Sequence, residues 1–156
     1  VTLASTQVII KEEVRFVNSQ ERNQKQQALL AFVELWKRAW ESDDVEHYLS
    51  FYSEKFRTGG SNYKSWVKRK RVLNKRIEQR KIHISDLSIL ESKNVVHVRF
   101  VQDYSSSNIT DIGMKELFIT QENGQYKIIS ENWSRLKSPQ PATLQYAYQD
   151  SEESAL

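Results

Sequence analysis

The hydrophobic positions change their period once along the chain, near Ile82. Before that point apolar residues recur at intervals of three and four, which is typical of helices that bury one face. Beyond it they alternate with polar residues, which is typical of strands with one face in a core. Helices followed by strands predict an α+β fold.

The first predicted helix runs from about Glu21 to Ser42, after a cap at Asn18 or Ser19. Its apolar residues follow the spacing of a single helical face. That face comprises Leu29, Phe32, Val33, Trp36 and Trp40.

Two further helices are predicted before the strands. One begins after a cap at Asp43 and ends at Gly59-Gly60, and the next begins after a cap at Ser61 or Asn62. The apolar face of the earlier helix consists of Val45, Tyr48, Leu49, Tyr52 and Phe56. The apolar face of the later helix consists of Trp66, Leu73 and Ile77.

Four antiparallel strands are predicted from Ile82 onward. A change of parity near Ser85-Asp86 predicts a bulge, which would bend the first strand. Asn123-Gly124 predicts a tight hairpin between the last two strands. Three helices packed in the concave face of such a bent sheet form a cone. The strands after the first are expected at about Val96–Tyr104, Ile112–Gln121 and Tyr126–Leu136.

The composition excludes several kinds of functional site. The chain has no cysteine, which excludes disulfides and thiol nucleophiles, and its three histidines are too far apart in sequence to suggest a metal site. We therefore predict no metal and no cofactor. Residues 64–81 carry nine basic side chains against one acidic one, so the net charge of +3 conceals a strongly basic segment.

Two groups of candidate binding residues follow from these patterns. Aromatic residues of the helices and of the second strand, with a polar residue on the apolar face of that strand, could line the mouth of the cone and stack on a sugar or an apolar ligand. These pocket candidates are Trp36, Trp40, Tyr48, Tyr52, Trp66, Phe100, Gln102 and Tyr104. The basic helix supplies anion-binding candidates, namely Lys68, Arg69, Lys70, Arg71, Lys75 and Arg76.

Each group also has a simpler interpretation. Aromatic residues at helical spacing commonly form core, and a run of cations commonly forms a solvated face. An isomerase-like enzyme would need a carboxylate base inside the cone. Asp103 lies opposite the apolar face of its strand, and Glu131 has the parity of Trp133 rather than that of Ile128. No catalytic residue is therefore predicted.

Several local sequences, in this order, resemble the nuclear transport factor 2-like superfamily, which includes the SnoaL-like proteins, over about residues 22–136. More narrowly they are similar to the version appended C-terminally to bacterial murein L,D-transpeptidases. The matching segments are 36–40 (WKRAW), 48–52 (YLSFY), Trp66, 84–87 (ISDL), 99–106 (RFVQDYSS), 115–117 (KEL) and 126–131 (YKIISE).

The resemblance implies an extended segment over residues 1–20 that is similar to the end of an L,D-transpeptidase catalytic domain. It further implies a nuclear transport factor 2-like domain over 21–137 and a polar tail over 138–156. The implied role is non-catalytic: the domain would hold peptidoglycan, its stem peptide or a protein substrate near a catalytic L,D-transpeptidase domain, in the periplasm of a Gram-negative bacterium. Nucleic acid is not an expected partner. An isomerase or cyclase using the cone, and a homodimer formed through the sheet, remain as alternatives.

Overall fold

The computed structural model describes residues 19–107 and 109–136. The predicted segment 1–20 lies outside these residues except for its last two, which begin the first helix, and the predicted tail 138–156 lies wholly outside them. The helices are α2 (Ser19–Glu41), α3 (Val45–Leu49) and α4 (Tyr63–Arg76). The strands are β1 (Arg57–Thr58), β2 (Ser61–Asn62), β3 (Lys81–Glu91), β4 (Val96–Ser105), β5 (Thr110–Glu122) and β6 (Gln125–Arg135).

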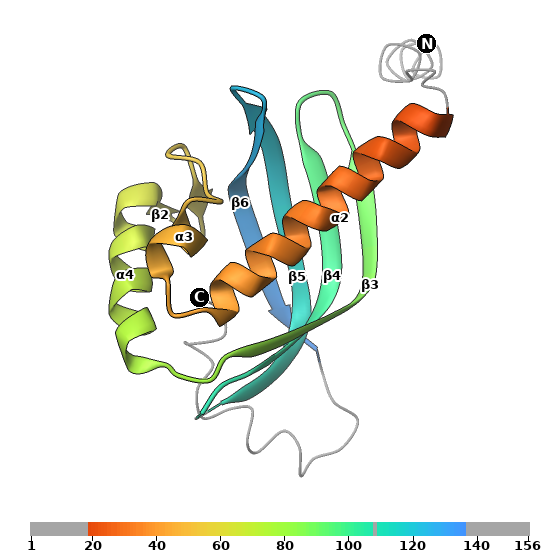
Figure 1. Ribbon diagram of the computed structural model, residues 1–156. Helices are drawn as coiled ribbons and strands as arrows, with labels where there is room; N and C mark the ends of the chain where they lie inside the picture. Colours follow the sequence, from red (N-terminus) through yellow and green to blue (C-terminus); the bar gives the residue numbers. More distant parts are fainter. Residues whose placement is uncertain (1–18, 108, 137–156) are drawn as a thin grey trace, which may run out of the picture.

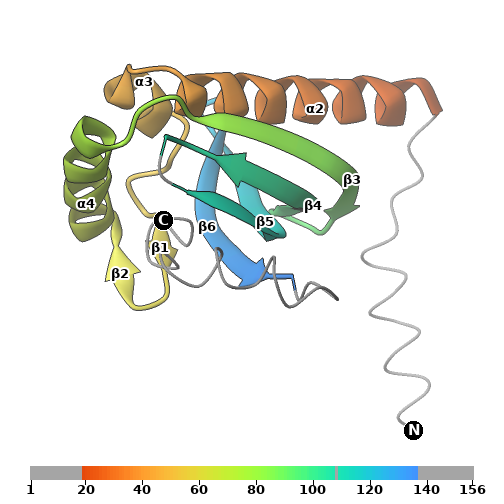
Figure 2. The ribbon, with the colours of Figure 1, turned by 90° about the horizontal axis from the view of Figure 1, so that it is seen from below.

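Strands β3 to β6 form one antiparallel sheet in sequence order. The helix α2 lies across one face of this sheet, and α3 and α4 stand at one end of it (Figures 1 and 2). The predicted α+β architecture, with helices against a bent antiparallel sheet, is confirmed. None of the described helices is long and apolar enough to cross a membrane.

The two predicted irregularities of the sheet are confirmed. The pairing of β3 with β4 shifts between Ser85 and Ser88, where Asp86 has a φ of 52°. Asn123 and Gly124 connect β5 to β6 with φ values of 52° and 78°, the left-handed backbone that a tight hairpin turn requires.

The second predicted helix is too long. It begins after Asp44, whose side chain accepts a hydrogen bond from the backbone N–H of His47, and it ends at Leu49. Tyr52 instead forms a parallel bridge with Ile128 of β6. Ser53 donates its backbone N–H to the carbonyl of Ile128, and the N–H of Ile128 in turn donates to the carbonyl of Phe51. This tertiary pairing with the sheet overrides the helical pattern.

The predicted end of that helix at Gly59-Gly60 is likewise wrong. The two glycines have φ values of 47° and 85° and form the turn between the two-residue strands β1 and β2. The third helix begins as predicted, because the side chain of Asn62 accepts a hydrogen bond from the backbone N–H of Ser65.

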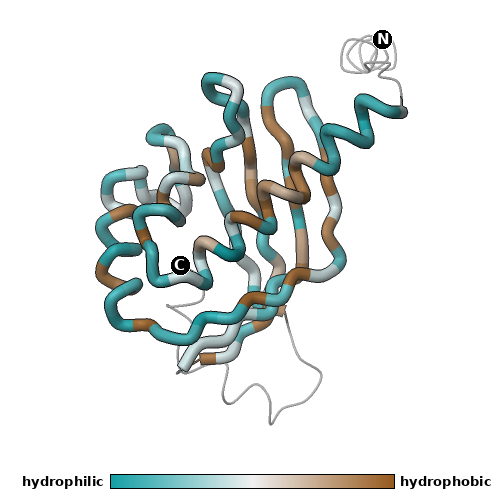
Figure 3. The backbone as a smooth tube through the Cα atoms, viewed as in Figure 1, coloured by the Kyte–Doolittle hydropathy of each residue, from teal (hydrophilic) through white to brown (hydrophobic). Residues whose placement is uncertain are grey.

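The core lies between α2, α4 and the sheet. The first turns of α2 are hydrophilic, and apolar positions begin where the helix crosses the sheet (Figure 3). The buried side chains of α2 are Leu29, Val33, Trp36, Ala39 and Trp40.

Candidate functional site: a buried cationic pocket

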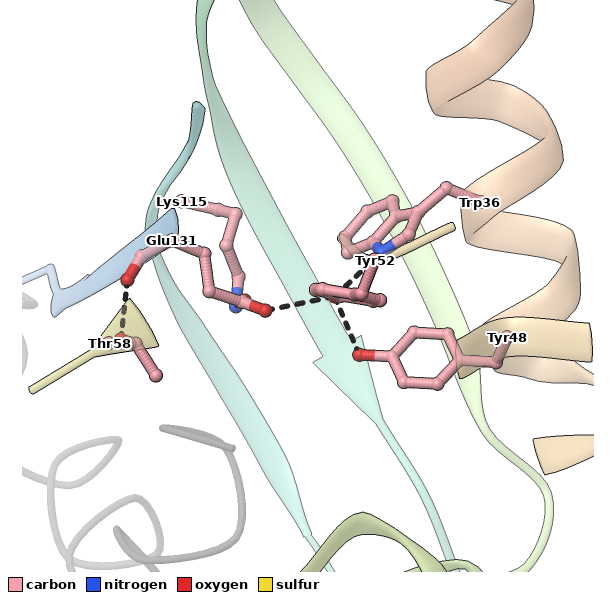
Figure 4. A network of polar contacts seen from close by, with 6 residues as sticks. All are labelled: Trp36, Tyr48, Tyr52, Thr58, Lys115 and Glu131. Atoms are coloured by element: carbon pink, nitrogen blue, oxygen red, sulfur yellow. Dashed lines mark hydrogen bonds and ion pairs between the residues drawn. The ribbon is translucent and has the colours of Figure 1, made fainter. Parts of the chain in front are cut away.

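A chain of polar side chains crosses the interior from α2 to β6 (Figure 4). The indole Nε1 of Trp36 donates to the hydroxyl of Tyr52 at 3.0 Å, and that hydroxyl donates to Glu131 Oε1 at 2.9 Å. Tyr48 shares a 2.9 Å hydrogen bond with the same Tyr52 hydroxyl. Lys115 Nζ lies 2.6 Å from the other oxygen of Glu131. The carboxylate is thus held on both of its oxygens.

The strand register explains how Lys115 and Glu131 come to face inward. Lys115 has the same parity as Leu117, which is fully buried. On β6 the pairing shifts between Phe118 and Ile119, so that Ile129 is one extra residue on that strand. Beyond this bulge the side chains of β6 exchange faces. The prediction that Glu131 faces away from the cone is therefore wrong.

Glu131 is a charged group rather than a poised base. Burial raises the pKa of its carboxyl, but the charges of Lys115 and Lys70 and the two hydrogen bonds oppose burial, and the net pKa is lowered. Burial, and then the charge of Glu131, raise the pKa values of Tyr48 and Tyr52 well above the usual range. Both phenols are therefore neutral hydrogen-bonding groups at ordinary pH.

Lys70 occupies a cage of aromatic rings. Its Nζ lies 5.4 Å from the centroid of Trp40, 5.7 Å from that of Tyr48 and 5.5 Å from that of Trp66. These distances suit cation–π attraction, in which a ring face stabilises the ammonium. Burial nevertheless lowers the pKa of Lys70 to about 7.

Lys115 has a similar aromatic environment on the sheet side. Its Nζ lies 5.6 Å from the ring of Trp40 and 5.7 Å from that of Trp133. Trp133 can lie so close to β5 because its neighbour Gly113 has no side chain. A Cβ at that glycine would approach the Trp133 ring to 2.5 Å.

A small pocket opens beside Lys70, with a volume of about 20 Å³. Arg80 also lines it and is only 7% exposed. No carboxylate belongs to the described residues of its wall. The pocket is lined by Trp40, Val45, Tyr48, Lys70, Leu73, Asn74, Ile77, Arg80 and Tyr104.

The pocket candidates from the sequence separate into two groups. Trp40, Tyr48 and Tyr104 line this pocket. The others lie deeper in the core, where Trp66 contacts Lys70 and the Gln102 amide has no hydrogen-bond partner among the described residues. The deeper group consists of Trp36, Tyr52, Trp66, Phe100 and Gln102.

The anion-binding candidates also separate. Lys70 is buried and points inward, whereas Lys68, Arg69, Arg71, Lys75 and Arg76 are exposed on the outer side of α4.

Sequence reasoning did not assign Arg80, Lys115 or Glu131 to the site. The parity of Lys115 with Leu117 is a usable signal for burial, although lysine is ordinarily expected at the surface.

These features can bind a ligand. The one buried carboxylate of the polar chain is paired with Lys115, and within the described residues no cluster of histidine and acidic side chains could hold a metal ion. What the geometry offers is a pair of buried cations, Lys70 and Arg80, beside aromatic rings. Such a site can receive an anion whose remaining atoms are apolar or planar.

A four-stranded bent sheet with α2 across it and a polar cluster inside defines a nuclear transport factor 2 (NTF2)-like domain. The chain belongs to the family described as the Cds6 C-terminal NTF2-like domain, whose sequence model matches residues 28–132. No curated protein matches the chain.

Solved structures include two relatives at appreciable identity. Bd1075 of Bdellovibrio bacteriovorus is 37% identical, with a TM-score of 0.74 over 81% of this chain and 46% of that one. The K307A mutant of Pgp2, a helical cell shape determining protein of Campylobacter jejuni, is 31% identical, with a TM-score of 0.62 over 66% and 38%. The chain thus spans less than half the length of either protein.

An NTF2-like protein of unknown function from Pseudomonas putida KT2440 has a TM-score of 0.65 at only 9% identity, over 76% of this chain and 91% of that one. This likeness shows the fold alone.

Proposed function

We propose that the domain is a non-catalytic binding module of an L,D-transpeptidase-related protein in the Gram-negative periplasm, and that it holds peptidoglycan through an anionic group of the stem peptide. The observation that carries the proposal is the pair of buried cations, Lys70 and Arg80, on the wall of one pocket that has no carboxylate among its described residues.

The charge balance favours an anion. Within the described residues Arg80 has no ion pair although it is buried, and Glu131 is already bonded to Lys115. A buried charge without a partner is costly, because desolvation is not offset by attraction. A carboxylate that enters the pocket would supply that attraction for Arg80, and would add to the attraction that Lys70 already has from Glu131.

The size of the pocket limits what enters. A volume of about 20 Å³ has room for roughly one water molecule, so the pocket admits at most a small polar group. We therefore assign the buried contact to a terminal or side-chain carboxylate, and leave the glycan outside. The rings of Trp40, Tyr48 and Tyr104 on the wall provide surfaces for the aliphatic part of the peptide.

The relatives support this role. Pgp2 is named as a determinant of helical cell shape, and the shape of a walled bacterium is maintained by its wall. The whole-protein activities of Pgp2 and Bd1075 are not transferred, since more than half of each lies outside the match.

The test is isothermal titration of the full chain with a purified disaccharide–tetrapeptide from peptidoglycan, and with the same fragment after amidation of its carboxylates. We expect Arg80→Gln to weaken binding about tenfold, the effect of losing ~1.4 kcal/mol. We expect the amidated fragment to bind the wild-type chain about as weakly as the unmodified fragment binds Arg80→Gln. Arg76→Gln, an exposed cation on the last turn of α4, is the matched control and should bind like wild type.

Circular dichroism confirms that each variant is folded. The proposal is wrong if folded Arg80→Gln binds the fragment like wild type, or if amidation leaves binding unchanged.

A further inference from the structure

The outer side of α4 carries cations that the pocket does not use. The helix buries Trp66, Val67, Lys70 and Leu73 and exposes most of its remaining residues. The helix is therefore basic on two sides: Lys70 faces the interior, and the other cations face solvent. The exposed cations are Lys64, Lys68, Arg69, Arg71, Lys75 and Arg76.

Three of these cations line a second hollow, an open groove of about 750 Å³. Its apolar part includes Val67, which is buried, and Val72, which is 51% exposed. Tyr63 and Glu54 also contribute to it. The groove is far larger than the pocket beside Lys70 and shares no lining residue with it.

The cations of the groove are only partly neutralised. Arg71 forms a 2.7 Å ion pair with Glu46. Within the described part of the chain Lys64 and Lys68 have no carboxylate partner. Glu54 is the one carboxylate among the described residues that line the groove. The groove therefore keeps an excess of positive charge beside an apolar strip.

We propose that this groove is a second binding site, and that it takes an extended acidic peptide segment. Lys64 and Lys68 lie four residues apart, which is ~6 Å along a helix axis at 1.5 Å per residue. Side chains on the same side of an extended peptide repeat every ~6.8 Å. Acidic residues at alternate positions can thus reach both lysines in turn.

The apolar strip and the shape favour a peptide over other anions. An extended chain can lay its backbone and every second side chain against Val67 and Val72 while its carboxylates reach the rim. A free phosphate would leave that strip uncovered, and a flat lipid surface would not enter a hollow. The site does not depend on the function proposed for the inner pocket, because the two share no residue.

Fluorescence anisotropy of the full chain with a fluorescein-labelled Glu-Ser-Glu-Ser-Glu-Ser-Glu peptide tests this. The comparison peptide has glutamine in place of every glutamate. We expect the acidic peptide to bind and the glutamine peptide to bind at least ~10-fold more weakly, because the charge-assisted contacts are lost.

Two double variants separate the groove from general electrostatics. Lys64→Glu/Lys68→Glu changes two cations of the groove, and Lys75→Glu/Arg76→Glu changes two exposed cations of the same helix that do not line it. Both alter the net charge equally. We expect the first to weaken binding about tenfold or more, and the second to do so less than about threefold, as long-range screening predicts.

Three results would overturn the inference: equal losses in the two variants, no binding of the acidic peptide at low salt, or tighter binding to phosphatidylglycerol vesicles than to the peptide. Arg80→Gln should bind the acidic peptide like wild type. A loss in that variant would place the peptide in the inner pocket and would also contradict the inference.

Discussion

The inner face of the sheet has two halves of opposite character. The half nearer the β5–β6 turn is aliphatic, and Ile119 and its partner Ile128 are fully buried there, with Val96 beside Ile119 on β4. The half nearer the start of β3 is polar, and buries Gln102, Lys115 and Glu131 opposite Lys70 of α4.

Physical chemistry assigns the two halves different uses. Burial of aliphatic surface stabilises a fold by ~25 cal/mol per Å². A buried ion pair adds little net stability, because desolvation offsets the attraction, and its replacement by apolar residues is often neutral. The aliphatic half therefore supports the fold. The polar half contributes little to stability, which fits the binding role proposed for it.

The largest expected effect follows from removing only one member of the buried ion pair in the polar half. Lys115→Met leaves the Glu131 carboxylate buried without its ion-pair partner. We expect a loss of about 3–5 kcal/mol in the free energy of unfolding, the range for an uncompensated buried charge. Urea unfolding followed by circular dichroism measures it.

The double variant Lys115→Met/Glu131→Gln is its control, because the glutamine removes the stranded charge. It should recover most of the stability lost by Lys115→Met. If the double variant is as unstable as the single one, the ion pair itself supports the fold and the contrast between the halves is wrong.

Truncation in the aliphatic half should cost somewhat less. Ile119 is fully buried between Val96 of β4 and Ile128 of β6. Ile119→Ala should lower the free energy of unfolding by about 2–5 kcal/mol, because it removes buried apolar contacts and leaves a cavity. The same urea titration measures this change. The variant should still bind peptidoglycan under conditions where it is fully folded. A loss of binding there would show that the two halves are coupled.

The effect of pH is the smallest for each unit of pH, although it accumulates over the titration range. The pKa of Lys70 is lowered to about 7 by burial, whereas an unfolded lysine titrates near ~10.4. Between these values the unfolded chain binds more protons, so this group makes stability rise with pH, by at most ~1.4 kcal/mol per unit. Urea midpoints measured from about pH 6 to about pH 10 should show this rise in wild type and lack it in Lys70→Met. An identical profile in both proteins would contradict the buried titration.

The sequence predicts the fold better than the site. Alternation and turn chemistry are local signals, and they place the four strands, the bulge near Ser85 and the Asn123-Gly124 turn correctly. The early end of α3 depends on Tyr52 pairing with Ile128, a contact between residues distant in sequence. No local pattern could report it.

The site depends on a second non-local feature. With Ile129 present, Glu131 faces inward only because the register shifts on β6, and nothing in the residues around Ile129 marks that shift. Arg80 lies after the end of α4, and it is buried where it lines the pocket. Buried charge is therefore what sequence patterns miss most readily, since they assign lysine, arginine and glutamate to the surface.

The extra residue at Ile129 has a wider consequence for β6. It divides the strand into two phases, so that odd-numbered positions face outward on one side of it and inward on the other. Without that residue the alternation of β6 would run unbroken from Ile128, opposite Ile119, to Ser130, opposite Phe118, and Glu131 would keep its inward face. The extra residue therefore gives β6 a bend and a stronger local twist, and does not decide which side chains its distal segment turns inward.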